Sequence, residues 1–254
     1  MIPKIIHFCW LSGDEFPQEI QKCIDSWKKH LPDYEFWLWD RKRFNIDEVP
    51  WVKEAFENKK YAFAADYIRL YALYNYGGIY LDSDVLVYKS FDSILHLPYF
   101  IGEDYTGYFE PAIIGSEKQM PWIKELLNHY TNRHFIKENG SYDMTPLPVI
   151  LHNTFKDSYK FYRTKGKSYS IIPNTLFVFP KNYFNSRDSV GAIKTKDSFS
   201  SHNYSGSWVN TSKSFKEMIK KKCPHSILRI IFHITNKLNK NKIGLYKIKY
   251  SKDI

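Results

Sequence analysis

The spacing of hydrophobic positions along the chain alternates between the period of a strand and the period of a helix. This alternation predicts an α/β protein. Residues 4–10 form a short apolar run with β-branched and aromatic side chains, which predicts a first strand. Residues 17–30 repeat apolar positions at helical spacing, and residues 34–39 form a second apolar run. The order strand, helix, strand predicts a parallel crossover unit. Further strands are expected at 85–88, 99–103, 112–115 and 176–180, and further helices at 51–58 and 121–137.

The stretch from Tyr61 to Leu81 is apolar on nearly every face and predicts a buried helix followed by a buried strand. Its only charges are Asp66 and Arg69, which lie three positions apart and therefore project from one helix face. Aspartate and arginine are rarely buried unless they are paired, bound to something or placed in a cleft. The Gly77-Gly78 pair suits a left-handed helix end. We therefore expect the two charged side chains to point together at a functional cleft.

Two carboxylates follow the strand, in the sequence Asp82-Ser83-Asp84. The strand period of two places both carboxylates on one side. Adjacent carboxylates raise each other's pKa unless a cation compensates, and hard divalent cations prefer oxygen ligands. Protein-bound Mg²⁺ usually keeps several positions for water and substrate phosphates. A bare Asp-x-Asp is also common in turns, so the metal interpretation depends on the apolar strand and the charged helix before it.

Two further stretches carry side chains suited to such a site. Trp10 follows the first strand, at the edge where ligands of open α/β sheets gather, so it is either a platform for a nucleotide base or an ordinary core residue. His202 is a metal-capable side chain, and it is followed by the Ser207 hydroxyl and the Trp208 indole donor. A lone histidine is more often structural, so composition alone does not assign His202 to the site.

Composition predicts a soluble, folded chain rather than a membrane-spanning or disordered one. The 254 residues suffice for one large α/β domain with a small appendage. Aromatic residues make up 18% of the chain, which suits a core with aromatic-lined clefts, and the mean hydropathy is −0.47. No run approaches the roughly 20 apolar residues of a membrane span. Three widely spaced cysteines and an N-terminus without a signal-like apolar run predict a cytoplasmic location.

The net charge of +10 is concentrated at the C-terminal end of the chain. Residues 211–254 carry 12 of the 37 basic and 2 of the 27 acidic residues, so residues 1–210 are neutral. A neutral body with an acidic cleft argues against nucleic acid as a partner. We expect a catalytic domain over 1–210 and a basic helical segment over 211–254. Residues 220–242 predict a basic amphipathic helix that either contacts an acidic membrane surface or packs back on the body.

Four stretches together resemble glycosyltransferase family 32, whose members carry a DXD sugar-binding region and include yeast-type initiating mannosyltransferases and bacterial capsular sugar transferases. More distant features are similar to the large glucosylating bacterial toxins. The resemblance covers roughly the first 210 residues in a consistent order. Its motifs are IPKIIHFCW at 2–10, SWKKHLPDYEFWLWD at 26–40, AADYIRLYALYNYGGIYLDSDV at 64–85 and HNYSGSW at 202–208.

The resemblance implies a GT-A fold, that is, an α/β nucleotide-sugar-binding domain with a mixed central sheet. It implies a divalent cation, Mn²⁺ or Mg²⁺, and a nucleotide-sugar donor, with a UDP-linked sugar favoured by the tryptophan platform. The implied metal ligands are Asp82, Asp84 and His202. The implied donor-binding residues are Trp10, Asp66, Arg69, Gly78, Asp82, Ser83, Ser207 and Trp208.

Two positions depart from the family pattern. Ala65 stands where relatives often have a serine, so a hydroxyl contact is lost there. Glu110 stands in the region where relatives often carry an asparagine. Its carboxylate lies either near the anomeric carbon or on the acceptor side, which makes Glu110 a catalytic candidate beside Asp66 and Arg69.

The resemblance implies a retaining transfer of a hexose to a glycan acceptor. Such a reaction needs stabilisation of the departing diphosphate and of an oxocarbenium-like sugar. A phosphate oxygen of the leaving group could take the acceptor's proton, or a carboxylate such as Glu110 could act as a transient nucleophile. A lipid-linked acceptor in surface polysaccharide synthesis suits the basic tail, with the enzyme peripheral at the inner face of the membrane.

Several alternatives remain open at this stage. Within the class, the chain could be a GDP-mannose-dependent mannosyltransferase or a protein-glycosylating effector. Outside it, the DSDV stretch is similar to the start of a haloacid-dehalogenase-type phosphatase, although that fold would leave the Asp66 and Arg69 helix unexplained. A cationic membrane-binding module built on the tail is the remaining alternative.

Overall fold

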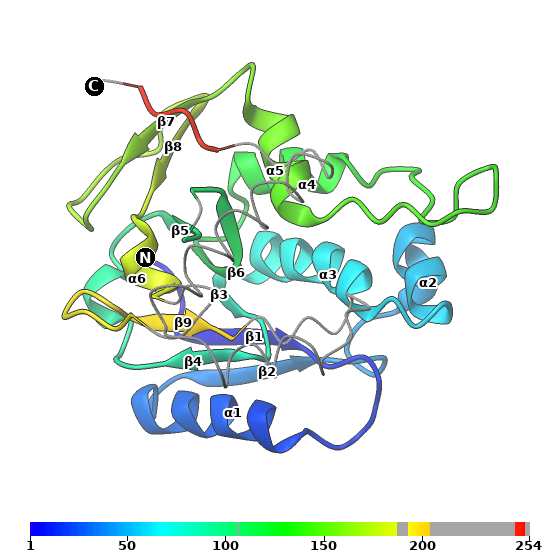
Figure 1. The fold of residues 1–254 in the computed structure, drawn as a ribbon, viewed down its shortest axis with the longest axis horizontal. Coiled ribbons are helices and arrows are strands. Elements are labelled where there is room, and N and C mark those ends of the chain that lie inside the picture. Colours follow the sequence, from blue (N-terminus) through cyan, green and yellow to red (C-terminus); the bar gives the residue numbers. More distant parts are fainter. Residues whose placement is uncertain (106, 187–192, 204–246, 252–254) are drawn as a thin grey trace, which may run out of the picture.

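A five-stranded mixed sheet forms the centre of the protein, in the strand order β2-β1-β3-β6-β5 (Figure 1). Strand β1 pairs in parallel with both β2 and β3, while β6 runs antiparallel to β3 and to β5. The five strands are β1 (Ile5–Cys9), β2 (Glu35–Trp39), β3 (Gly78–Leu81), β5 (Tyr99–Glu103) and β6 (Phe109–Ser116). The expected α/β class with a mixed central sheet is confirmed.

The computed structural model describes most of the chain. The described residues are 1–105, 107–186, 193–203 and 247–251. The predicted donor contacts Ser207 and Trp208 lie outside them, as do the domain boundary at 210 and the predicted basic helix at 220–242. Among the residues that are described, no helix combines the length and apolar character needed to cross a membrane.

The first three elements form the predicted parallel crossover. Helix α1 (Gln18–His30) connects β1 to β2, whose register runs from Ile5 opposite Glu35 to Cys9 opposite Trp39. The helix buries one face, which its apolar residues form at helical spacing: Ile20, Cys23, Ile24 and Trp27. The periodicity of the sequence therefore predicted each end of β1, α1 and β2 to within one residue.

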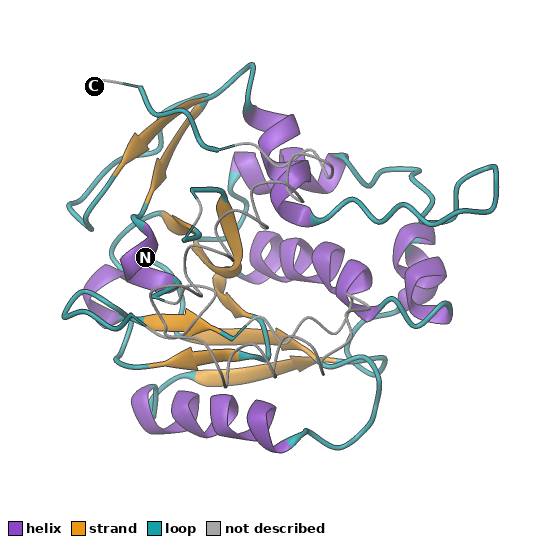
Figure 2. Cartoon of the chain, viewed as in Figure 1, coloured by secondary structure: helices purple, strands orange, loops and turns teal. Residues whose placement is uncertain are grey.

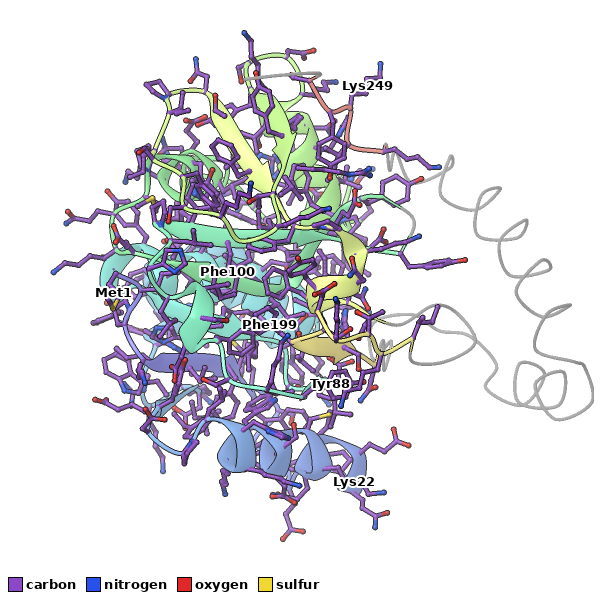
Figure 3. All side chains as sticks on the ribbon, turned by 90° about the vertical axis from the view of Figure 1, so that its left-hand side faces the viewer. Met1, Lys22, Tyr88, Phe100, Phe199 and Lys249 are labelled. Carbon is purple, nitrogen blue, oxygen red and sulfur yellow. The ribbon has the colours of Figure 1, made fainter. Side chains whose placement is uncertain are left out.

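Helices lie on both faces of the central sheet (Figure 2). Strand alternation divides the core into two layers, one on each face of the sheet. In β3, Ile79 and Leu81 pack on the α1 side, whereas Tyr80 between them faces the opposite layer around α3. Phe100 and Phe199, labelled in Figure 3, belong to the layer on the α1 side and are buried.

Helix α3 (Tyr61–Tyr76) covers the other face of the sheet. Its buried residues lie on nearly all sides of the helix and include both Asp66 and Arg69, as the sequence predicted. Three further helices surround it in the same layer: α2 (Pro50–Glu57), α4 (Pro121–Asn128) and α5 (Leu147–Phe155).

The two glycines after α3 serve the connection to β3. Gly77 caps the helix with φ +66°, and its N–H donates to the Leu73 carbonyl at 2.9 Å. At Gly78, φ is +105° and an added Cβ would lie 2.7 Å from the Ile5 carbonyl oxygen. Only glycine therefore allows β3 to leave the helix and pair closely with β1.

Two smaller sheets flank the central one. Strand β4 (Val85–Val87) pairs antiparallel with β9 (Ser200–His202), and β7 (Lys160–Arg163) pairs in parallel with β8 (Thr175–Val178). The described residues 247–251 lie beside β7 (Figure 1), where the Ser251 N–H donates to the Phe161 carbonyl at 2.8 Å. The remaining short elements are the 3-10 helices η1 (Ile46–Glu48) and η2 (Asp92–Ile94) and helix α6 (Lys181–Phe184).

Helix α4 is shorter than predicted, because it ends at Asn128 rather than near residue 137. Asn132 adopts φ +56°, a left-handed conformation that a continuing helix excludes. The following residues turn back toward α2, where the Ile136 N–H donates to Glu54 at 2.9 Å. Tertiary contacts with α2 therefore end the helical path despite the favourable sequence pattern.

Candidate active site

The two predicted metal-binding aspartates lie in a turn rather than on a strand. Strand β3 ends at Leu81, and the turn Asp82-Ser83-Asp84 is closed by the Val85 N–H donating to the Asp82 carbonyl at 3.0 Å. The Asp82 N–H donates to the Ala112 carbonyl at 2.9 Å, which fixes the turn to β6. The expectation that a strand period aligns the two carboxylates was therefore wrong, and the turn brings them together instead.

His202 reaches this turn through the pairing of β4 with β9. Val85 is the register partner of His202, so the histidine lies one residue away from Asp84 across the sheet. His202 Nε2 is 3.2 Å from Asp84 Oδ1, and the Asn203 N–H donates to the Asp84 carbonyl at 3.1 Å. Three residue pairs between β4 and β9 thus bring together Asp84 and His202, which are more than a hundred residues apart in the sequence.

The donor set at this place suits a hard divalent cation. One ligand atom from each of Asp82, Asp84 and His202 lies within 4.8 Å of the other two. Two carboxylate oxygens with one imidazole nitrogen match the preferences of Mn²⁺ and Mg²⁺ for oxygen-rich sites. The Asp82 side chain is 25% exposed, so the site remains open on one side to water or to a phosphate.

Arg69 connects the buried helix α3 to the same turn. Its Nη2 lies 2.9 Å from Asp66 Oδ1 and 3.1 Å from Asp82 Oδ1, while Nη1 donates to the Pro111 carbonyl at 2.8 Å. The guanidinium carbon also lies 4.6 Å from the ring centroid of Tyr80, in cation–π contact. Asp66 and Arg69 therefore point at one place, as the sequence predicted, and that place adjoins the two aspartates.

The buried charges alter one another's pKa. Burial raises the pKa of Asp66 to about 7, since the opposing effect of Arg69 is smaller and Asp82 adds to the increase. Burial likewise raises the pKa of Asp82, against the attraction of Arg69. Burial lowers the pKa of His202, but Glu110 and Asp84 outweigh it and hold that pKa well above its usual value. A site crowded with carboxylates in this way favours a bound cation.

Glu110 lies behind His202 on β6, 4% exposed. One carboxylate oxygen accepts from the Asn185 side-chain amide at 2.5 Å, and the other accepts from the Ala112 N–H at 3.2 Å. The second oxygen also lies 3.3 Å from His202 Nδ1. The structure thus places Glu110 in the site, on the side of the histidine that faces away from Asp84.

Trp10 lies beyond the end of β1, on the same edge of the sheet as the aspartates, because His7 in β1 pairs in parallel with Tyr80 in β3. Its indole N–H donates to the Asp14 carbonyl at 2.7 Å, and its ring packs edge-on against Phe16 with centroids 5.1 Å apart. The half-buried ring therefore lies at the edge of the sheet where a base platform was predicted.

Gly78 does not lie at this edge of the sheet. It begins β3, whereas Asp82 follows the end of that strand, and its surroundings are Ile5 and His7 of β1. Its place in the donor-binding set is therefore corrected: the structure accounts for this glycine by close strand packing. The error arose because Gly78 is adjacent to the motif in sequence but separated from it by the length of the strand.

Sequence reasoning missed three contributors to the site. They are the Pro111 carbonyl and the Tyr80 ring, which hold Arg69, and the Asn185 amide, which holds Glu110. Tyr80 could have been found, since it alternates with the apolar residues that face the other core layer. A backbone carbonyl and an isolated asparagine carry no such signal.

Residues 17–101 match the model of the glycosyltransferase sugar-binding region containing DXD motif. The matched region includes Asp66, Arg69, Asp82 and Asp84, so it covers the helix and the turn that converge in the structure. It ends before Glu110, Asn185 and His202.

Several curated proteins are similar to the chain. An inositol phosphoceramide mannosyltransferase of Schizosaccharomyces pombe is 32% identical over 158 residues, which cover 58% of this chain and 43% of that protein. A mannosyl phosphorylinositol ceramide synthase of Saccharomyces cerevisiae is 34% identical over 146 residues, or 54% of this chain and 37% of that protein. An uncharacterized glycosyltransferase of Acanthamoeba polyphaga mimivirus is 26% identical over 82% of this chain and 84% of its own length. The chain thus spans less than half of the two yeast relatives.

Among solved structures, the PaToxG glycosyltransferase is similar, with a TM-score of 0.48 and 22% identity over 61% of this chain and 68% of that one. Residues 17–101 of this chain therefore carry a glycosyltransferase sugar-binding region containing DXD motif, in agreement with the resemblance to glycosyltransferase family 32.

Proposed function

We propose that the protein is a cation-dependent glycosyltransferase that moves a hexose from a nucleotide sugar to a glycan or glycolipid acceptor with retention of configuration. The observation that carries this proposal is the convergence of Asp82, Asp84 and His202 within 4.8 Å, beside the Arg69 guanidinium. Three ligand atoms and an adjacent fixed positive charge suit a diphosphate that gains negative charge as it departs.

Each side chain has a distinct part in the proposal. Asp82, Asp84 and His202 hold Mn²⁺ or Mg²⁺, which supplies Lewis-acid stabilisation of the leaving diphosphate when bound. Arg69 is held by Asp66 and by the Pro111 carbonyl, so its positive charge needs no reorganisation during the reaction. Trp10 offers the base platform at the same edge of the sheet. Ser83 in the turn, with Ser207 and Trp208, completes the proposed donor contacts.

Two nucleotide sugars are candidate donors, a UDP-linked hexose and GDP-mannose. The sequence favoured a UDP-linked hexose because of Trp10, whereas the yeast relatives are named for transfer of mannose, which favours GDP-mannose. The same names refer to inositol phosphoceramide and to mannosyl phosphorylinositol ceramide, which supports a lipid-borne acceptor. A cytoplasmic enzyme that contacts the membrane through residues 220–242 agrees with such an acceptor. The phosphatase alternative has no support from the family match.

A thermal-shift panel with the full chain tests the donor and cation together. A ligand that binds only the folded protein raises its melting temperature, so the correct nucleotide sugar should do so more strongly with Mn²⁺ present than without it. GDP-mannose and a series of UDP-hexoses form the panel, and release of the nucleoside diphosphate measures turnover with the donor that binds. Product NMR then reports whether the anomeric configuration is retained.

The variant Asp84→Ala should keep the fold and lose cation-dependent turnover, because it removes one of the three ligand groups. The matched control is Asp14→Ala, which removes an exposed carboxylate near Trp10. Near-normal turnover of Asp84→Ala at saturating Mn²⁺ would show that the cation assignment is wrong.

A further inference from the structure

His202 is contacted by a carboxylate at each of its ring nitrogens. Nε2 lies 3.2 Å from Asp84 Oδ1, on the side of the proposed cation, and Nδ1 lies 3.3 Å from Glu110 Oε1 on the opposite side. Carboxylates this close to both nitrogens restrict the orientation of the ring. Metal-binding histidines commonly use one nitrogen for the metal and the other for an orienting carboxylate or carbonyl.

Glu110 is itself held in place. The Asn185 side-chain amide donates to Glu110 Oε2 at 2.5 Å, and the Ala112 N–H donates to Oε1 at 3.2 Å. Both Glu110 and Asn185 are buried, at 4% and 1% exposure, so neither is available to an acceptor arriving from solvent. A buried carboxylate that receives donors on both oxygens is suited to hold a neighbour rather than to attack a sugar.

Asn185 is fixed relative to His202 by the packing of α6 against β9. Asn185 follows the last residue of α6, and the neighbouring Ser186 hydroxyl donates to the Ser200 carbonyl at 2.9 Å. In return, the Ser200 hydroxyl donates to the Phe184 carbonyl at 2.8 Å. The segment that carries Asn185 and the strand that carries His202 are therefore joined next to the site.

We propose that Asn185 and Glu110 are positioning residues for the cation: Asn185 holds Glu110, and Glu110 holds the His202 ring so that Nε2 faces the two aspartates. This inference rests on the proposed function and assigns Glu110 a role behind the metal ligand instead of a nucleophilic role at the sugar. It also explains why the buried carboxylate of Glu110 on β6 and the buried amide of Asn185 after α6 lie next to His202 on β9.

Binding of Mn²⁺ alone to the full chain tests the positioning role without any transfer reaction. The EPR signal of unbound Mn²⁺ gives the dissociation constant. Outer-shell partners of metal ligands typically contribute 10- to 100-fold to affinity, so Glu110→Gln should weaken Mn²⁺ binding by about 10-fold or more. Asn185→Ala should weaken it by a smaller factor, because Asn185 acts through Glu110.

The neighbouring strand offers a matched control. Glu103 on β5 is also a 4% exposed carboxylate, but its partners are Arg163 and Tyr250 rather than His202. Glu103→Gln should therefore leave the Mn²⁺ dissociation constant unchanged, even if it lowers stability as much as Glu110→Gln does. Should Glu110→Gln fail to fold, Asn185→Ala decides the question, since this side chain is one step further from the cation.

A double-variant cycle shows whether Glu110 acts through the histidine. In a His202→Ala background, Glu110→Gln should have no further effect on Mn²⁺ affinity. An equal further loss in that background would overturn the inference. It would also be overturned if Glu110→Gln left Mn²⁺ affinity intact but lowered kcat at saturating Mn²⁺, which is the result expected of a nucleophile.

The proposed function fails in a different way. If Asp84→Asn does not weaken Mn²⁺ binding, the cation site itself is wrong, and the positioning role is overturned with it. If Asp84→Asn weakens binding while Glu110→Gln and Asn185→Ala do not, the cation site stands and only the positioning role is wrong.

Discussion

Arg69 is the residue on which the charges of the site depend. It contacts Asp66 in its own helix and Asp82 in the turn, and only 5% of it is exposed. Charged groups removed from water are tolerated when their partners compensate them, and removing one partner leaves the other uncompensated. Arg69 therefore contributes to folding as well as to any effect on the diphosphate, which sequence reasoning had considered alone.

We expect Arg69→Met to lower the free energy of unfolding by about 3–5 kcal/mol, because Asp66 then lies buried without its cation. Urea denaturation measures this loss. Asp66→Asn combined with Arg69→Met should recover part of it, since the uncompensated carboxylate is gone. Full stability of the single variant would mean that Asp66 has another source of compensation. At temperatures where the variant is folded, turnover should fall by about 10²- to 10³-fold.

The residues predicted from sequence were those that share a local pattern. Asp66 and Arg69 stand out because two charges interrupt a long apolar stretch, and Asp82 and Asp84 because they follow a buried strand. Asn185 was not predicted, because its role arises only when α6 and β9 are packed together. Glu110 was selected as a candidate, but its contacts with His202 and Asn185 depend on pairing between distant parts of the chain.

At the scale of elements, one histidine fixes the junction between α3 and the sheet. His7 in β1 is fully buried, with Nε2–H donating to the Gly77 carbonyl at 2.7 Å and Nδ1 accepting from the Trp39 indole N–H at 3.1 Å. Both nitrogens are used by a neutral ring, and burial lowers the pKa of His7 to about 4. Protonation would place a second N–H against the indole donor.

The contribution of His7 to stability should therefore fall as the pH falls from about 6.5 to about 4. In that window the unfolded chain binds a proton at His7 and the folded protein does not, so at this residue acid favours unfolding, by up to about 3 kcal/mol. The raised pKa of the buried Asp66 carboxyl acts in the opposite sense over the same range, so the comparison is made between variants. Urea denaturation at a series of pH values measures the slope of stability against pH. His7→Gln should change that slope by about one proton, whereas His96→Gln at an exposed position should not. An unchanged slope for His7→Gln would assign the acid sensitivity to other groups.

The glycine after α3 makes a second prediction at this scale. Gly78→Ala forces a Cβ to within 2.7 Å of the Ile5 carbonyl oxygen at φ +105°, so it should lower the free energy of unfolding by more than about 2 kcal/mol. Gly140→Ala is the control, because φ there is +77° but nothing lies within 4 Å of the added atom. Equal losses in the two variants, measured in urea, would show that backbone conformation alone matters and that strand packing does not.

The elements that the sequence located well are those with a strong local period. The β1, α1 and β2 unit and helix α3 agree with their predicted spans, since each shows a long regular pattern of apolar positions. Helix α4 did not agree, because Asn132 and the contacts of the following residues with Glu54 end it early. A strand period was applied to Asp82 and Asp84 although they lie in a turn, because the apolar strand β3 precedes them and Val85 resumes the apolar pattern directly after them.

At the scale of the whole molecule, charge is divided between a neutral body and a basic end. Residues 1–210 contain equal numbers of basic and acidic side chains, so the net charge of +10 belongs to residues 211–254. Residues 247–251 of that segment pack on the body, where Tyr250 donates to Glu103 at 2.7 Å. The proposed membrane contact therefore concerns the preceding basic residues at 220–242.

We expect the full chain to float with liposomes that contain anionic lipid and to remain unbound with neutral ones. Replacing Lys220, Lys221 and Lys222 by glutamine should weaken partitioning by about 10²-fold, since each basic residue near an acidic surface contributes about 1 kcal/mol. The matched control replaces Lys22, Lys28 and Lys29, exposed residues of α1 in the neutral body. Equal binding of both triple variants would argue against a membrane role for the tail.

The pairing of β4 with β9 has a consequence for biosynthesis. Asp84 is made early and His202 late, so the ribosome must release both strands before the third of the proposed metal ligands can join the first two. A nascent chain that stops short of β9 would already possess the DXD turn and the charged helix while lacking the histidine. Capture of divalent ions should consequently appear abruptly in a series of C-terminally lengthened nascent chains, once β9 clears the exit tunnel.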